Sequence, residues 1–202
     1  THGGSATFFK GLQVPQSDVK SDLRRKFRAT RDNFVANLTS GEAAISFSCL
    51  PSPLAQLCTP RKIVAGYVAI GSEADPAKLL TAAAEQGCTL ALPYVTSKTS
   101  PMRFLQWQAG DPLENGPFGL SQPKADAPEV TPDIVLVPLV AFDTQLMRLG
   151  QGAGHYDRAL SVMGNSIAIG VAWSVQLAEN LPSDPWDMPL DAVLTESSWI
   201  SR

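Results

Sequence analysis

The chain has 202 residues, of which 44% are hydrophobic, and a formal net charge of −3. This length and composition fit one globular domain with a substantial core. The slight negative charge gives no bulk attraction to nucleic acid or to an anionic membrane, and no apolar run reaches the roughly 18 residues of a membrane span. The three cysteines, Cys49, Cys58 and Cys88, form no C-x-x-C pair, which favours a reduced, cytoplasmic setting.

The N-terminal region predicts a tail followed by a basic helix. Residues 1–16 match no element, so we interpret them as a tail or a remnant of expression and assign residues 17–202 to a single domain. Apolar residues recur at helical spacing from 17 to 40, with Ser17 as the expected N-cap and Gly41 as the expected stop. One face of this helix carries four cations, Lys20, Arg24, Arg28 and Arg31. Taken alone, such a face is typical of a solvated helix.

The rest of the chain alternates strands with helices. Strands are predicted at 63–70, 88–93, 134–142, 167–173 and 192–195, and a short hairpin around 102–107. Helices are predicted at 76–86 and 156–163, with a short one after Ser174. This order predicts an α/β fold, a single-domain three-layer α/β/α sandwich with a mostly parallel sheet.

The segment from Pro138 to Leu160 is the most informative part of the chain. Glycines at 150, 152 and 154 separate a buried strand from a helix, and backbone N–H groups at such a helix N-terminus bind phosphate or another anion. Arg148 can pair with phosphate oxygens, and Asp157 suits a magnesium ion carried in with a nucleotide. The loop is neither a Walker loop nor a Rossmann fingerprint. Taken alone, the glycines are better explained by a turn that needs positive φ.

The full sequence of residues 138–160 favours the anion-binding explanation over a plain turn. VPLVAFD followed by RLGQGAGHYDRAL resembles the signature of the 5-formyltetrahydrofolate cyclo-ligase family, also called methenyltetrahydrofolate synthetases. The segments KSDLRRKFRATRD, GSEADP, FGLSQP and WDMPLDAVLTES are similar to further family segments. The resemblance runs in the same order from about Asp18 to Ser197.

The resemblance implies an enzyme that uses ATP and Mg²⁺ to cyclise 5-formyltetrahydrofolate, with or without a polyglutamate tail, to 5,10-methenyltetrahydrofolate. The formyl group would be phosphorylated first, and ADP and phosphate would be released. We expect a cytoplasmic monomer that binds neither nucleic acid nor membrane. The alternatives are a non-catalytic folate- or nucleotide-binding relative and a different small-metabolite enzyme on a sugar-phosphate-isomerase-like fold.

The same resemblance assigns residues to roles, with Arg148 and Asp157 as the catalytic candidates. ATP would be bound by Lys20, Arg24, Arg148, Gly150, Gly152, Gly154, His155 and Tyr156. The folate would be bound by Val68, Glu73, Phe118, Gln151, Gly152, Ala153, Gly154 and His155. Magnesium would be held by Asp157 and Asp187.

Several of these residues have plainer explanations. Taken alone, Glu73 is equally a turn carboxylate in water, and Asp191 is better explained by capping. The loop departs from the family at Gln151, Ala153 and His155, so the backbone amides are expected to cradle the phosphates. His155 is expected to gain a proton at about pH 6.5 and then to bind the anion better.

Overall fold

The computed structural model describes residues 16–202, so nearly all of the expected tail lies outside the described residues. The α-helices are α1 (Gln16–Ala36), α2 (Ser40–Ile45), α3 (Ser52–Leu57), α4 (Ala77–Glu85) and α5 (His155–Val162). Two 3-10 helices, η1 and η2, span Pro117–Gly119 and Ser174–Gln176. Within this part of the chain, no helix is long and apolar enough to cross a membrane.

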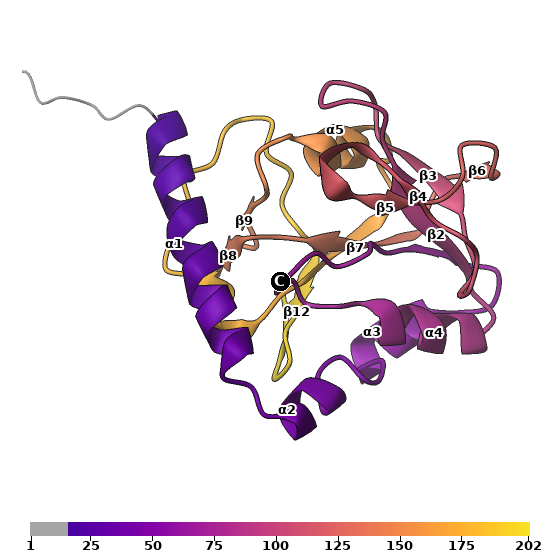
Figure 1. Ribbon diagram of the computed structural model, residues 1–202, viewed down its shortest axis with the longest axis horizontal. Coiled ribbons are helices and arrows are strands. Elements are labelled where there is room, and N and C mark those ends of the chain that lie inside the picture. Colours follow the sequence, from indigo (N-terminus) through magenta and orange to yellow (C-terminus); the bar gives the residue numbers. More distant parts are fainter. Residues whose placement is uncertain (1–15) are drawn as a thin grey trace, which may run out of the picture.

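Eight strands form the central sheet, in the order β13-β12-β10-β7-β1-β2-β3-β6 (Figure 1). They are β1 (Ile63–Ala65), β2 (Thr89–Tyr94), β3 (Arg103–Gln106), β6 (Glu129–Val130), β7 (Ile134–Pro138), β10 (Ile167–Val171), β12 (Ala192–Leu194) and β13 (Trp199–Ser201). The run from β12 to β2 is parallel, and β13, β3 and β6 pair antiparallel at the edges. The prediction of an α/β fold with a mostly parallel sheet is therefore confirmed.

Helices cover both faces of this sheet, as the pattern of β7 shows. Ile134 and Leu136 pack in one core cluster with residues of α3 and α4. Val135 and Val137 pack in a second cluster with Ala159 and Leu160 of α5. Because successive side chains of a strand point to opposite faces, a strand buried on both sides reads as a continuous apolar run.

Two smaller sheets complete the fold. A three-stranded sheet has the order β11-β8-β9, formed by β11 (Leu177–Ala178), β8 (Ala141–Asp143) and β9 (Arg148–Leu149). A two-stranded sheet pairs β4 (Glu114–Asn115) with β5 (Ser121–Gln122). Phe27 of α1 is buried against the three-stranded sheet, and Figure 1 shows α1 running past the ends of β8 and β9. This packing places the basic helix beside the segment that follows β9.

The strand order also fixes where a ligand is expected. The chain leaves β1 to one side through α4 and β2, whereas it leaves β7 to the other side through α5 and β10. β1 and β7 are neighbours in the sheet, so their carboxyl ends flank the point at which the strand order reverses. Ligands of open α/β sheets bind at such a point.

Two predicted helix boundaries are wrong. The helix expected over 17–40 ends at Ala36, because Thr39 caps a new helix: its Oγ1 accepts from the backbone N–H of Glu42 (3.2 Å), and the Glu42 carboxylate accepts from the Thr39 N–H (2.8 Å). Gly41 therefore lies inside α2 rather than stopping a helix. Ser17 lies inside the first turn of α1, which begins at Gln16.

Two predicted strands are also shorter than expected. The strand predicted over 63–70 ends at Ala65, and the chain then turns so that the buried Tyr67 hydroxyl donates to the Ala74 carbonyl. The apolar run 134–142 is divided between β7 and β8, which belong to different sheets. Beyond these changes, the helices α2 and α3 and the strands β4, β5, β6, β9, β11 and β13 were not predicted.

The close packing around Gly170 yields a stability prediction. A Cβ added there would lie 2.7 Å from Leu139 Cδ2 and 2.8 Å from Leu190 Cδ1, and both leucines are almost fully buried. We expect Gly170→Ala to destabilise the fold by about 1–3 kcal/mol through overpacking, measured by urea denaturation. Gly41→Ala is the control, because only Thr39 Oγ1 comes within 4.0 Å of the added Cβ; equal stability of both variants would contradict the prediction.

Candidate functional site

The glycine loop connects β9 to α5 through backbone conformations that favour glycine. Gly152 and Gly154 have φ angles of 108° and 66°, values that side-chain-bearing residues rarely adopt. Gly154 is the N-cap of α5 and supplies no side-chain cap. The first N–H groups of α5 thus lack a capping side chain, which leaves them suited to an anion. The predicted glycine-rich turn is present at the expected position, and its binding of an anion stays a prediction.

The basic face of α1 lies against this loop. The Arg24 Nε donates to the Gly150 carbonyl at 2.8 Å, and the Arg24 guanidinium carbon would lie 3.5 Å from a Cβ added at Gly152. One turn further, the Arg28 Nε donates to Gln151 Oε1 at 3.1 Å. The helix face is therefore a wall of the site and not simply a solvated surface.

Arg148 and Asp157 form a partly buried ion pair across the loop. Arg148 Nη2 lies 2.7 Å from Asp157 Oδ1, and the Arg148 side chain is only 3% exposed. The guanidinium also donates to the Met188 carbonyl, while the Met188 N–H donates to Asp157 Oδ1 at 3.1 Å. Burial lowers the pKa of Arg148 and the Asp157 charge opposes that shift. This cation is thus held in place at the edge of the loop.

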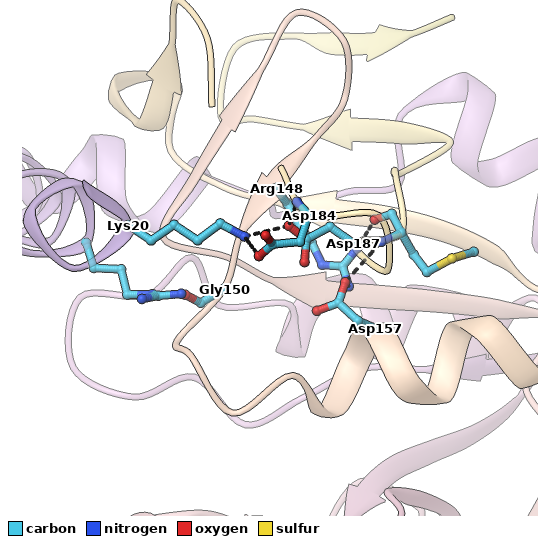
Figure 2. A network of polar contacts seen from close by, with 8 residues as sticks. Lys20, Arg148, Gly150, Asp157, Asp184 and Asp187 are labelled. Carbon is cyan, nitrogen blue, oxygen red and sulfur yellow. Dashed lines mark hydrogen bonds and ion pairs between the residues drawn. The ribbon is translucent and has the colours of Figure 1, made fainter. Parts of the chain in front are cut away.

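Lys20 holds a second group of acids. Its ammonium lies 2.6 Å from Asp184 Oδ2 and 2.7 Å from Asp187 Oδ2, and Figure 2 shows these two carboxylates facing it from the loop before β12. Burial lowers the pKa of Lys20, but the hydrogen bonds and charges of Asp184 and Asp187 outweigh this effect and leave the pKa raised. Lys20 therefore remains charged, and it fixes the loop to α1.

The chemistry of the two predicted magnesium ligands, Asp157 and Asp187, fits Mg²⁺. Asp157 Oδ1 accepts from Arg148 and from the Met188 N–H, and Asp187 Oδ2 accepts from Lys20 and from the Asp184 N–H. Within residues 16–202 no group of three or more His, Cys, Asp or Glu residues could form a metal cage. Mg²⁺ is commonly bound by one or two carboxylates together with substrate phosphates, so the donor set fits magnesium arriving with a nucleotide.

The opposite end of the site is built around Glu73, which follows β1. Gln151 Nε2 donates to Glu73 Oε1 at 2.9 Å, and the Ile70 N–H donates to Glu73 Oε2 at 3.1 Å. Tyr156 and Tyr67 lie nearby: burial, and next the Glu73 charge, raises the pKa of both phenols. The Arg148 charge acts against the raised pKa of Tyr156. The segments after β1 and β9 thus meet at one site.

Known proteins are similar to this chain in sequence and in fold. A sequence profile of the 5-formyltetrahydrofolate cyclo-ligase family matches residues 16–196. The chain belongs to this family. The 5-formyltetrahydrofolate cyclo-ligases of Haemophilus influenzae and Mycolicibacterium smegmatis are each 32% identical to it, over 87% of this chain and 99% and 93% of theirs. The structure of Aquifex aeolicus 5,10-methenyltetrahydrofolate synthetase matches with a TM-score of 0.72 at 29% identity, covering 91% of this chain and 92% of that one.

The structure of this family member brings most of the predicted site residues together. Lys20, Arg24, Arg148, Asp157 and Asp187 are linked through the contacts above, as are Glu73 and Gln151. Val68 is half-buried against the core, and the Ala153 carbonyl accepts from Arg158 at 3.0 Å. The Phe118 side chain lies outside the described part of the chain. Asp191 accepts from the Ala168 N–H at 2.8 Å, which confirms its structural role.

Asp184 is the site residue that the sequence analysis missed. Next to Pro185 it is typical of a turn, and its partner Lys20 is 164 residues away. The spacing to Asp187, three residues on, is the one local signal that could have identified it.

The expectation that His155 gains a proton at about pH 6.5 is wrong. Burial and the Arg158 charge hold the pKa of His155 below 6.5, and Arg158 Nη2 lies 3.2 Å from His155 Nδ1. The ring Nε2 is buried and has no hydrogen-bond partner among the residues that the structure describes. Burial, the larger cause, and the Arg158 charge both oppose an imidazolium at this position, whereas the Ser100 backbone acts in the opposite direction without reversing the shift of the pKa.

This environment gives a pH dependence of stability. Because the pKa of His155 is lowered in the folded state, the unfolded state binds the proton first as the pH falls below about 6.5. The contribution of neutral His155 is therefore present above that pH and is lost below it. We expect the melting temperature of the wild type to fall more than that of His155→Gln between pH 7.5 and 5.5. Parallel melting curves over this range would contradict the prediction.

Proposed function

We propose that the protein catalyses the ATP- and Mg²⁺-dependent cyclisation of 5-formyltetrahydrofolate to 5,10-methenyltetrahydrofolate, releasing ADP and phosphate. Membership of the cyclo-ligase family supports this assignment. The observation that carries it is that basic groups and a carboxylate lie close together where the strand order of the sheet reverses. Phosphate-binding cations and a bare helix N-terminus lie on one side, and an acceptor carboxylate, Glu73, lies on the other.

The reaction needs activation of a poor electrophile. The formyl group on N5 is amide-like, so its oxygen is a poor leaving group. Transfer of the terminal phosphoryl group of ATP to that oxygen gives a formyl phosphate ester-like intermediate and ADP. The N10 lone pair then attacks the activated carbon, the C–O bond breaks, and phosphate departs as N10 loses its proton. Catalysis of this kind rests on alignment and charge stabilisation.

The chain supplies the groups for that alignment. Lys20, Arg24 and Arg148 would bind phosphate oxygens together with the first N–H groups of α5. Glu73 would accept hydrogen bonds from N–H groups of the pterin and fix the formyl group toward the loop. Asp157 and Asp187 would hold magnesium, which neutralises charge on the phosphates when bound.

The cations and carboxylates of the site are paired with each other. Lys20 pairs with Asp187 and Arg148 pairs with Asp157. A nucleotide that brings both phosphate and Mg²⁺ offers new partners of the right sign to both members of each pair. ATP without the metal would compete with the carboxylates for the cations, so we infer that the nucleotide binds well only as its magnesium complex.

The proposed activity is tested by following methenyltetrahydrofolate formation by absorbance. We expect turnover only when ATP and Mg²⁺ are both present. Glu73→Gln should weaken folate binding at least tenfold and leave Mg·ATP binding nearly unchanged, because the amide carries no charge and replaces one acceptor oxygen by an NH2 donor. Turnover without ATP would refute the proposal. Binding of both ligands without turnover would identify a non-catalytic relative.

The role of the basic helix is tested by charge removal at two positions. Lys20→Ala should raise the dissociation constant of Mg·ATP at least tenfold, measured by calorimetry, since it removes a phosphate contact of low exposure. Arg25→Ala is the matched control: the Arg25 side chain is 79% exposed and pairs with Asp22 of the same helix, so little effect is expected. Equal effects of the two substitutions would return α1 to a purely structural role.

A further inference from the structure

Trp186 is a large aromatic side chain exposed beside the phosphate-binding cluster. It is 69% exposed, whereas Trp173 is buried and Trp107 and Trp199 are partly buried. It immediately precedes Asp187, a partner of Lys20. Trp side chains usually bury most of their surface, so an indole left in water next to a ligand site is a candidate binding surface.

The backbone around Trp186 is tightly constrained. The Asp187 N–H donates to the Asp184 carbonyl at 3.0 Å, which closes a β-turn with Pro185 in its second position and Trp186 in its third. The Asp184 N–H donates in turn to Asp187 Oδ2 at 2.8 Å. Lys20 holds both carboxylates (Figure 2). The turn that carries the indole is thus fixed to α1, and little backbone entropy remains to be lost on binding.

The contacts of α1 order the site along one line. Lys20, Arg24 and Arg28 follow one another at four-residue intervals, each about 6 Å along the helix axis. Lys20 contacts Asp184 and Asp187, Arg24 contacts Gly150, and Arg28 contacts Gln151, which donates to Glu73. The acceptor for folate therefore lies at the Arg28 end, the glycine loop in the middle, and Trp186 at the Lys20 end.

This order determines what Trp186 can meet. The transferred phosphoryl group must lie between the folate and the rest of the nucleotide. With the pterin at Glu73 and the terminal phosphate at the glycine loop, the remaining phosphates and the nucleoside extend past Lys20. We propose that Trp186 stacks on the base of the bound nucleotide, an inference that rests on the proposed function. Every base has a flat π-face, so stacking supplies affinity without strong base selectivity.

Calorimetry with two probes in the presence of Mg²⁺ tests this role. Trp186→Ala should weaken ATP binding about tenfold or more, in line with the stacking energies of aromatic side chains, and should leave the affinity for inorganic tripolyphosphate unchanged. Trp186→Phe should retain most of the ATP affinity. Because the side chain is mostly exposed, melting temperatures of the three proteins should agree closely.

Other outcomes would overturn the proposal. An equal loss of tripolyphosphate binding would show that Trp186 acts through the turn that positions Lys20. Unchanged ATP binding with weakened 5-formyltetrahydrofolate binding would place the ring on the folate, and unchanged binding of both would leave it without a ligand. If wild-type protein bound 5-formyltetrahydrofolate but no ATP, the proposed function would fail as well.

Discussion

The site depends on the pairing of its own cations with its own carboxylates. Lys20 reaches Asp187, 167 residues further along the chain, and Arg148 reaches Asp157 across the glycine loop. A buried charge without a partner is strongly destabilising, and Arg148 is almost completely removed from solvent. The pairs therefore hold in place the charges that would bind phosphate under the proposed function. A phosphate chain with a divalent cation would then offer new partners to both members of each pair, whereas a simple anion would offer a partner only to the cations.

The fold brings these charges together through one feature of its topology. β1 and β7 are neighbours in the central sheet. Glu73 follows β1, and the glycine loop follows β9, which the chain reaches from β7 through β8. The loop cannot close the site by itself, because its own side chains offer no cation. Helix α1 supplies the cations, and the three-stranded sheet sets its position. Phe27 of α1 packs in one core cluster with Val140 and Leu149, and this packing turns the basic face of α1 toward Gly150. A hydrophobic contact thus sets the position of the electrostatic one.

Local sequence patterns predicted the parts of the structure that local forces determine. The roles of the acidic and basic site residues came from the family resemblance and stay predictions. The parallel sheet and the glycine-rich turn before α5 were predicted from period, spacing and motif. The division of residues 134–142 into β7 and β8 was not predicted, because the second half of this apolar run belongs to a different sheet. Asp184 was missed for a similar reason, since its role depends on Lys20 at the other end of the chain. The pKa of His155 likewise depends on burial and on Arg158, which its position in the motif does not reveal.

Gln151 illustrates how a departure from the family pattern is accommodated. Its amide oxygen accepts from Arg28, and its amide nitrogen donates to Glu73. A cationic side chain at this position could pair with Glu73 but would repel Arg28, and a carboxylate would do the reverse. Among common side chains, glutamine has both the donor and the acceptor and the length to span the gap. A neutral residue here therefore couples the helix that would bind the nucleotide to the carboxylate that would bind the folate. In this protein the two halves of the site are joined through a side chain that carries no charge.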